Sequence, residues 1–180
     1  MHRLFIGLRP PHTIRAQLLA LMGGVPAARW QSDEQLHLTL RYIGEVSAPM
    51  AEDIAMMLAR LHAPAPVAQL AGVGRFDKKG RTDSLWAGVV PVAPLAALHN
   101  KVNRALALLG LPFEERSFVP HITLARLPRS QGAGPTIDAF IAQHATLASA
   151  PFNLAHLILF ESQLTSEGAV YEPRARWPLG

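Results

Sequence analysis

The chain has 180 residues, of which 49 % are hydrophobic, so it is long enough and apolar enough to bury a core, and global disorder is excluded. It contains no cysteine, which excludes disulfide bonds, a thiolate nucleophile and a cysteine-based zinc site. The formal net charge of +4 is too small to indicate nucleic-acid binding by itself, and no segment approaches the roughly 18 apolar residues of a membrane span. We therefore expect a cytoplasmic protein without a membrane partner.

The first half of the chain alternates predicted strands and helices. A strand is expected over residues 3–8, and an amphipathic helix over 13–22 ends at two glycines. A second strand is predicted over 36–43. Ser47 is a suitable N-cap for the next helix, which we expect to run to residue 62.

The second half contains more strands than helices. Several of its strands are joined by short turns without a crossover helix, which favours an α+β class with mostly antiparallel sheets and flanking helices. The predicted elements are strands at 67–73 and 84–90 joined by a polar turn at 77–83, a helix at 94–109, a strand at 119–127, a short helix at 137–143, and strands at 152–160 and 169–177.

One tetrapeptide pattern occurs twice, as His-Leu-Thr-Leu at 37–40 and His-Ile-Thr-Leu at 121–124. The alternation of polar and apolar residues is typical of a strand with one buried face, and it places His and Thr on the same side about 6–7 Å apart. Because the copies lie about half the chain apart, we expect residues 1–180 to form one pseudo-duplicated domain of two lobes. The two motifs would then meet in a central cleft.

This set of side chains suits the opening of a phosphodiester. The ordinary pKa of histidine is about 6.5, so one imidazole can accept a proton while the other donates one. Threonine hydroxyls and an arginine can bind the non-bridging phosphate oxygens. A strained cyclic phosphodiester has less need of a metal, and no metal-binding spacing such as His-x-His or His-Glu-x-x-His occurs, so we expect no metal and no cofactor.

The remaining histidines are not arranged for catalysis. His12, His62 and His99 fall on predicted helices, where we expect surface or edge positions, as for His144. His156 lies in an apolar strand and is expected to be a hydrogen-bonded core residue.

Longer matches around the motifs resemble a known family. The sequence is similar to the 2H phosphoesterase superfamily, and within it to the bacterial and archaeal RNA 2′,3′-cyclic phosphodiesterases, also called 2′-5′ RNA ligases. The segments that carry this resemblance are residues 3–6, 36–45, 85–89, 118–126, 171–172 and 176–179. The resemblance implies a bilobal fold and metal-independent hydrolysis of RNA 2′,3′-cyclic phosphate ends to 2′-phosphates. It also implies His37 as proton donor and His121 as proton acceptor, with Thr39, Thr123 and Arg126 holding the phosphate.

Two arginines compete for the phosphate. Arg126 lies an odd number of residues after His121 and would face away on a regular strand, so a β-bulge or a strand end is required. Arg41 is in phase with His37 and is the alternative. Tyr42, Phe5 and Trp86 could stack a base, although core or rim positions are the competing interpretation.

The expected partners are RNA with 2′,3′-cyclic phosphate ends or small cyclic nucleotides, bound by a monomer. A different class of function stays open, a non-catalytic module that binds a nucleotide or RNA end in the same cleft. Reversible 2′-5′ RNA ligation would use the same site, and the sequence does not separate it from hydrolysis.

Overall fold

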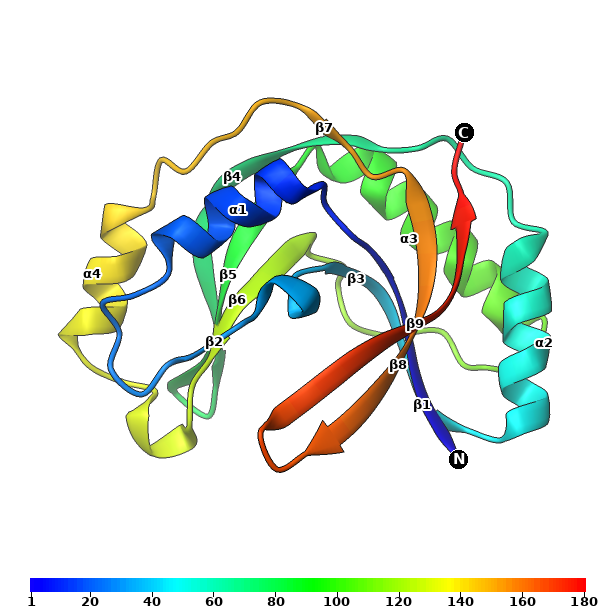
Figure 1. The fold of residues 1–180 in the computed structure, drawn as a ribbon, viewed down its shortest axis with the longest axis horizontal. Coiled ribbons are helices and arrows are strands. Elements are labelled where there is room, and N and C mark those ends of the chain that lie inside the picture. The colour runs from blue at the N-terminus through cyan, green and yellow to red at the C-terminus, as the bar shows by residue number, and fades with distance from the viewer.

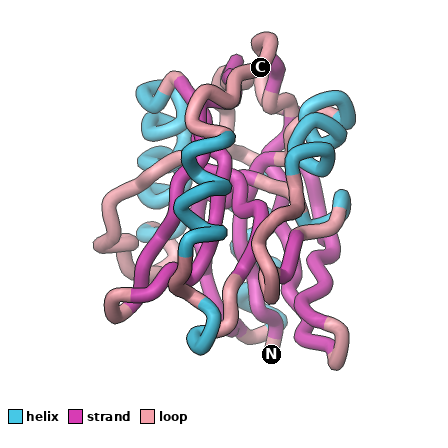
Figure 2. Tube along the Cα trace, turned by 90° about the vertical axis from the view of Figure 1, so that its left-hand side faces the viewer, coloured by secondary structure: helices cyan, strands magenta, loops and turns pink.

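The computed structural model describes residues 1–180. Nine strands form one curled sheet with antiparallel pairing, and four α-helices lie on its outer side (Figures 1 and 2). The predicted α+β class with antiparallel strands and flanking helices is therefore confirmed. The strands are β1 (His2–Leu8), β2 (Arg29–Trp30), β3 (Leu38–Val46), β4 (Val67–Lys78), β5 (Arg81–Val90), β6 (His121–Arg126), β7 (Phe152–Asn153), β8 (His156–Thr165) and β9 (Gly168–Pro178).

The helices are distributed over two lobes. The strand order β7-β4-β5-β6-β3-β1-β8-β9 has β6 and β3 in the middle, and β2 pairs with β6. We call β3, β1, β8 and β9 the β1 lobe, and β6, β5, β4 and β7 the β5 lobe. In Figure 1, α2 and α3 lie on the side of the β1 lobe, whereas α1 and α4 lie on the side of the β5 lobe. The helices are α1 (His12–Leu21), α2 (Ala48–Ala59), α3 (Val92–Ala107) and α4 (Pro135–Gln143), with the 3-10 helices η1 (Asp33–Gln35) and η2 (Arg129–Gln131).

The chain order repeats once, with an exchange between the lobes. Apart from the two-residue strands β2 and β7, the two 3-10 helices and the final strand β9, the first half runs β1-α1-β3-α2-β4 and the second β5-α3-β6-α4-β8. The third strand of each repeat pairs in the other lobe, because β4 pairs with β5 and β8 pairs with β1. The predicted pseudo-duplication is thus present, and the two central strands β3 and β6 carry the two repeated motifs.

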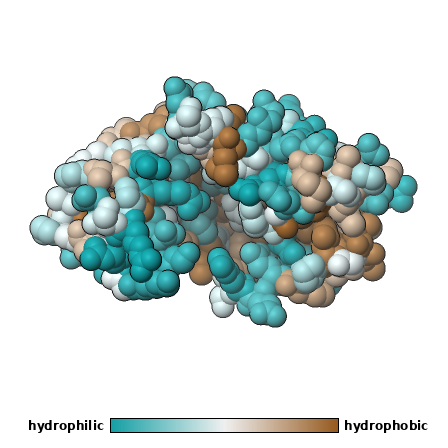
Figure 3. Space-filling view, turned by 90° about the horizontal axis from the view of Figure 1, so that it is seen from below, coloured by the Kyte–Doolittle hydropathy of each residue, from teal (hydrophilic) through white to brown (hydrophobic).

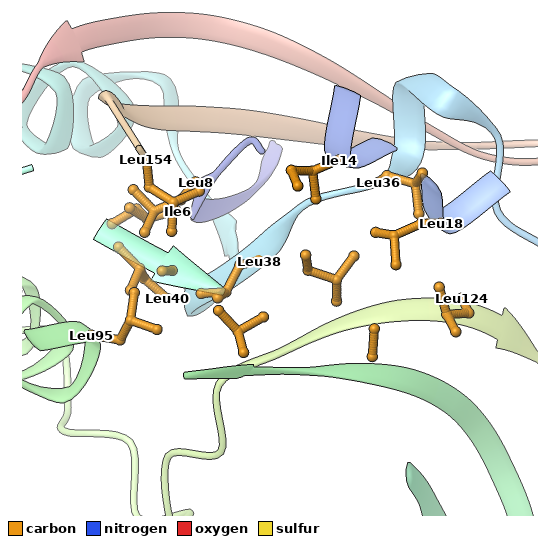
Figure 4. Packing of buried hydrophobic residues seen from close by; sticks show 14 of the residues in the cluster. Ile6, Leu8, Ile14, Leu18, Leu36, Leu38, Leu40, Leu95, Leu124 and Leu154 are labelled. Carbon is orange, nitrogen blue, oxygen red and sulfur yellow. The ribbon is translucent and has the colours of Figure 1, made fainter. Parts of the chain in front are cut away.

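The apolar residues of both motifs point into the main hydrophobic core. Leu38, Leu40, Ile122 and Leu124 are at most 1 % exposed. Figure 4 shows Leu38 and Leu40 packed close to Leu95 of α3, with Leu124 farther along the same core. Burial of these side chains, each contributing about 1.5–3 kcal/mol, fixes which face of the two strands turns away from the core.

Some element boundaries differ from those predicted. The polar segment 77–83 is mostly strand, because Lys79 and Gly80, both with positive φ, form a two-residue turn between β4 and β5. The segment 152–160 is divided into β7 and β8, which pair with β4 and β1 respectively. The helix expected from Ser47 to residue 62 ends at Ala59; the Ser47 hydroxyl accepts a hydrogen bond from Met50 N at 3.3 Å, as expected of an N-cap. No helix is long and apolar enough to cross a bilayer.

Candidate active site

The two motifs lie next to each other at the centre of the sheet. Strands β3 and β6 pair antiparallel with Leu38 opposite Ile122. Continued by one residue in each direction, this register sets His37 opposite Thr123 and Thr39 opposite His121. Directly opposite residues have Cβ atoms about 4.5–5.5 Å apart, so the four polar side chains share one face of the sheet within a small area.

Both imidazoles are oriented by the same backbone contact. His37 Nδ1 lies 2.6 Å from the carbonyl oxygen of Gln35, and His121 Nδ1 lies 2.6 Å from that of Val119. In each neutral ring Nδ1–H therefore donates to the carbonyl two residues earlier, and Nε2 is left as the acceptor. Nε2 of His37 lies 2.8 Å from the Thr39 hydroxyl, whereas Nε2 of His121 makes no hydrogen bond within the protein.

The segment that positions Gln35 is itself held on both sides. The Gln35 side-chain oxygen accepts from Ser32 N at 2.9 Å, which closes a capping box around η1. Its amide nitrogen donates to the carbonyl of Ala169 at 2.7 Å. Gln35 and Val119 orient the imidazoles through their backbone carbonyls, which every residue type has. The sequence therefore could not indicate their role.

Aromatic rings surround each imidazole. The His37 ring lies 4.8 Å from Phe5, 5.6 Å from Phe160 and 5.3 Å from Tyr171, measured between ring centroids. The His121 ring lies 4.8 Å from Phe76 and 5.8 Å from Trp86. These contacts restrict the orientation of both imidazoles and remove much of their surface from water.

The three predicted base-stacking residues all lie outside the residues that line the cleft. Phe5 is only 4 % exposed; its strand, β1, lies between β3 and β8, and its ring stacks on Phe160. Trp86 does not line the cleft; it fills the space left by Gly74, where a Cβ atom would lie 2.4 Å from the indole. Tyr42 is the most exposed of the three, at 51 %.

Burial lowers the pKa of both histidines. For His37 burial is the largest cause, opposed by the hydrogen bond to Gln35, and the charges of His121, Arg126 and Arg9 lower the pKa further, to about 4. For His121 burial again comes first, opposed by the bond to Val119, and Arg126 lowers the pKa further. The charge of Arg126 acts on both histidines and that of His121 acts on His37, so the three groups lie near one another. Both imidazoles are neutral at pH 7 in the free protein.

A β-bulge brings Arg126 to the cleft. Leu85 pairs with Ala125 whereas Trp86 pairs with Thr123, so Leu124 is an extra residue on β6. Leu124 and Ala125 are both fully buried, and Arg126 returns to the face that carries His121. The bulge that Arg126 required is therefore present.

The equivalent bulge turns Arg41 away. Gly7 pairs with Thr39 and Ile6 with Arg41, so Leu40 is the extra residue on β3. Arg41 is 5 % exposed, and its guanidinium donates to Asn103 Oδ1 and to the carbonyls of Pro112 and Tyr42. The alternative assignment of Arg41 to the phosphate is wrong, because the bulge puts this side chain on the buried face.

A cleft of about 570 Å³ opens over the motif face of the sheet. Figure 3 shows the hollow between the two lobes, with mainly hydrophilic residues along its rims. His37 is linked to the cleft through its bond to the Thr39 hydroxyl. The residues that line it come from β3, β4, β5, β6 and the segment before β6, and they are Thr39, Leu40, Phe76, Asp77, Lys78, Asp83, Ser84, Glu114, Arg116, Ser117, Phe118, Val119, His121, Thr123 and Arg126.

Two other histidines differ from expectation. His99, expected at the surface, is 5 % exposed; its Nδ1 lies 2.7 Å from the Leu40 carbonyl and its ring stacks on Phe118. His156, expected to be hydrogen-bonded in the core, is half-buried and makes no side-chain hydrogen bond. No three His, Asp or Glu side chains form a group that could hold a metal ion.

A curled antiparallel sheet with one His-x-Thr-x motif on each of its two central strands has the features of a two-histidine phosphoesterase. The chain belongs to the 2′-5′ RNA ligase superfamily, whose family model matches residues 10–165. A protein of Aeropyrum pernix named RNA 2′,3′-cyclic phosphodiesterase is 32 % identical over 150 residues, which cover 83 % of this chain and 84 % of that protein. A protein of Escherichia coli with the same name is 29 % identical over 185 residues, covering 98 % and 96 %.

Solved structures show the same architecture. A crystal structure of Escherichia coli LigT complexed with 3′-AMP superposes with a TM-score of 0.78 at 25 % identity, covering 99 % of this chain and 98 % of LigT. A crystal structure described as a phosphoesterase gives a TM-score of 0.81 at 26 % identity, covering 99 % and 98 %. The bilobal fold inferred from the sequence is therefore the fold of this superfamily.

Proposed function

We propose that this protein hydrolyses the 2′,3′-cyclic phosphodiester at RNA 3′ ends, or in small cyclic nucleotides, to leave a 2′-phosphate and a free 3′-hydroxyl. The observation that carries the proposal is the pair of imidazoles on adjacent central strands, each with Nδ1 bound to the carbonyl two residues earlier. Family membership and the names of the relatives support the same reaction.

In the proposed reaction His121 is the base. Its Nε2, free of protein partners, accepts a proton from a water molecule that attacks phosphorus in line with the bond to the 3′ oxygen. The new P–O bond forms as the P–O3′ bond breaks. His37 Nε2 gives its proton to the departing 3′ oxygen, so one proton is taken up and one released, and the products are a 3′-hydroxyl and a 2′-phosphate.

Three further side chains stabilise the charge on the phosphate. The hydroxyls of Thr39 and Thr123 and the guanidinium of Arg126 would bind the non-bridging oxygens, where negative charge accumulates in the transition state. The phosphate anion also raises the pKa of a neighbouring imidazole. Substrate binding therefore supplies the condition under which His37, neutral in the free protein, becomes protonated and acts as an acid.

All four motif side chains belong to the same chain, so we infer that residues 1–180 act as one domain and as a monomer. The same site run in reverse would join RNA ends through a 2′-5′ bond. The product analysis below distinguishes this reaction, because ligation lengthens the RNA whereas hydrolysis leaves its length unchanged.

The test is a short RNA with a 2′,3′-cyclic phosphate end incubated in EDTA, followed by mass spectrometry and phosphorus NMR of the product. We expect a 2′-phosphate end, and a loss of about 10²–10⁴-fold in kcat for His37→Ala and for His121→Ala. His62→Ala is the control, because His62 is exposed and outside the cleft. Full activity of both motif variants would refute the mechanism, and tight RNA binding without any turnover would indicate a binding module.

A further inference from the structure

A second pocket lies beside the cleft, at the tip of the hairpin formed by β4 and β5. We call it the hairpin pocket; it has a volume of about 240 Å³. Lys78 and Asp83 line both the hairpin pocket and the cleft, and Leu127 of the pocket directly follows Arg126 of the cleft. The two hollows are therefore neighbours. The lining residues of the hairpin pocket are Lys78, Lys79, Arg81, Thr82, Asp83, Leu127 and Arg129.

The hairpin pocket has a strong excess of positive charge. Lys78, Lys79, Arg81 and Arg129 face one carboxylate, that of Asp83. None of the four cations forms an ion pair or a side-chain hydrogen bond within the protein; Arg75, lower on the same hairpin, pairs with Asp77 and Asp138. Four unpaired cations around one pocket repel one another, and a bound anion would relieve that repulsion.

Backbone contacts hold the two sides of the hairpin pocket together. Thr82 N donates to the Gly132 carbonyl at 2.7 Å, and Leu127 N donates to the Asp83 carbonyl at 3.0 Å. A Cβ atom at Gly132 would lie 2.5 Å from the Thr82 carbonyl oxygen, so this close approach needs glycine. The segment that contains η2 is thereby fixed against β5, and Arg129 is kept on the same pocket as Arg81.

We propose that the hairpin pocket binds the backbone phosphates of the nucleotides on the 5′ side of the cyclic phosphate. This inference rests on the function proposed above. An RNA whose terminal phosphate lies at His121 and Arg126 has to leave the cleft along one of its rims. The rim at Lys78 leads directly into the hairpin pocket, where two arginines and two lysines are free to contact phosphate oxygens.

The inference predicts that the protein distinguishes RNA ends from cyclic mononucleotides. A mononucleotide fills only the cleft, whereas an oligonucleotide also gains the contacts of the hairpin pocket. Each phosphate that is contacted steepens the dependence of log affinity on log salt by about 0.7 for a single strand. We therefore expect oligonucleotide affinity to depend on salt much more strongly than mononucleotide turnover does.

The test compares two double variants of equal charge change. Arg81→Glu with Arg129→Glu reverses two charges of the hairpin pocket. Arg60→Glu with Arg104→Glu reverses two exposed charges of the β1 lobe that form no ion pair, one at the C-cap of α2 and one on α3. Arg81→Gln with Arg129→Gln provides a milder change should reversal disturb the hairpin. The probe for binding is a fluorescent hexaribonucleotide with a 2′-phosphate end, measured by anisotropy at several salt concentrations, and the probe for turnover is 2′,3′-cyclic CMP.

We expect the hairpin-pocket variants to weaken hexanucleotide binding by about tenfold or more and to reduce its salt dependence, with the Gln pair affected less. Turnover of 2′,3′-cyclic CMP should change less than about twofold, and the control pair should match the unmodified protein in both assays. Equal binding of the hexanucleotide by the hairpin-pocket and control variants would overturn the inference, even with catalysis intact. Loss of hexanucleotide binding only in the hairpin-pocket variants would support the inference, whether or not the protein hydrolyses a cyclic phosphate. Absence of hydrolysis would refute the proposed function alone.

Discussion

His37 and His121 are held by the same two means, a hydrogen bond from Nδ1 to a backbone carbonyl and close contact with aromatic rings. The hydrogen bond sets the tautomer, so that Nε2 is the atom available for proton transfer. The aromatic contacts have a cost, because burial disfavours the charged imidazole. In the free protein both imidazoles are therefore neutral at pH 7, and in the proposed mechanism the acid would arise only when an anionic substrate is bound.

This balance predicts the pH dependence of the reaction. The pH profile of kcat/KM reports the pKa values of the free protein, and its maximum lies midway between those of the acid and the base. Both histidine pKa values are lowered from 6.5, that of His37 to about 4, so the maximum is expected below pH 6.5. Bound phosphate raises both values, and the profile of kcat should shift to higher pH. Steady-state kinetics on 2′,3′-cyclic CMP measure both profiles, and a kcat/KM maximum above about pH 7 would contradict the prediction.

Gly7 leaves room for the His37 ring. A Cβ atom on Gly7 would lie 2.9 Å from the Leu38 carbonyl oxygen and 3.4 Å from both His37 Cδ2 and Phe160 Cε2. Gly7→Ala is expected to lower the free energy of unfolding by about 1–3 kcal/mol and to displace the imidazole, with a fall in kcat. Urea unfolding and kinetics measure the two effects. Unchanged stability together with unchanged kcat would show that β1 accommodates the methyl group freely.

At the level of strands, two equivalent bulges decide which arginine reaches the cleft. Both occur at the last residue of the motif, Leu40 on β3 and Leu124 on β6, and each reverses the phase of the strand beyond it. On β6 the reversal brings Arg126 to the cleft. On β3 it buries Arg41 and turns Tyr42 outward. The two halves of the repeat thus have the same bulge, but it brings an arginine to the cleft in one half and buries an arginine in the other.

The buried Arg41 connects β3 to helix α3. Its guanidinium donates to Asn103 Oδ1, and the Asn103 amide nitrogen lies 3.0 Å from His99 Nε2. Asn103→Leu leaves the buried guanidinium without one acceptor and His99 without its donor, so we expect a loss of about 2–4 kcal/mol in the free energy of unfolding. Asn100→Leu, on the exposed side of the same helix, is the control and should change it by less than about 0.5 kcal/mol. Chemical denaturation measures the free energy of unfolding of both variants. Equal losses would show that the hydrogen bonds of Asn103 contribute no more to stability than an exposed side chain does.

For the folded molecule as a whole, the lowered pKa of His37 makes stability depend on pH. Between pH 6.5 and about 4 the unfolded chain binds a proton at this histidine and the folded chain does not. The free energy of unfolding therefore falls as pH falls through this window, by up to about 3 kcal/mol from His37. The contribution of the neutral His37 imidazole to the free energy of unfolding is fully present above pH 6.5.

The corresponding measurement is urea unfolding of the unmodified protein and of His37→Gln at about pH 7.5 and at about pH 4.5. The unmodified protein should lose more stability between the two conditions than the variant does. Asp33 and Glu161 also have lowered pKa values, but they titrate in both proteins and cancel in the difference. Identical losses would mean that the His37 imidazole protonates freely in the folded state.

The exchange of β4 and β8 between the lobes ties the two halves of the chain together. The β1 lobe contains β8 and β9 from the second half of the sequence, whereas β4 and β2 from the first half pair in the β5 lobe. Strand β3 meets β6 only at Leu38 and Ile122. The proposed active site lies at this narrow contact. The proposed catalytic geometry consequently depends on both lobes being folded.

The sequence alone determined the α+β class, the two motif strands, the duplication and the four polar side chains that meet in the site. These follow from short-range alternation, because a strand with Leu38 or Ile122 in the core has to present its His and Thr on the other face. Only the tertiary structure decided the bulges at Leu40 and Leu124 and the burial of His99 and Phe5. Those outcomes depend on the register of neighbouring strands and on helix packing, which involve residues far apart in the chain and leave no periodic signal in the sequence.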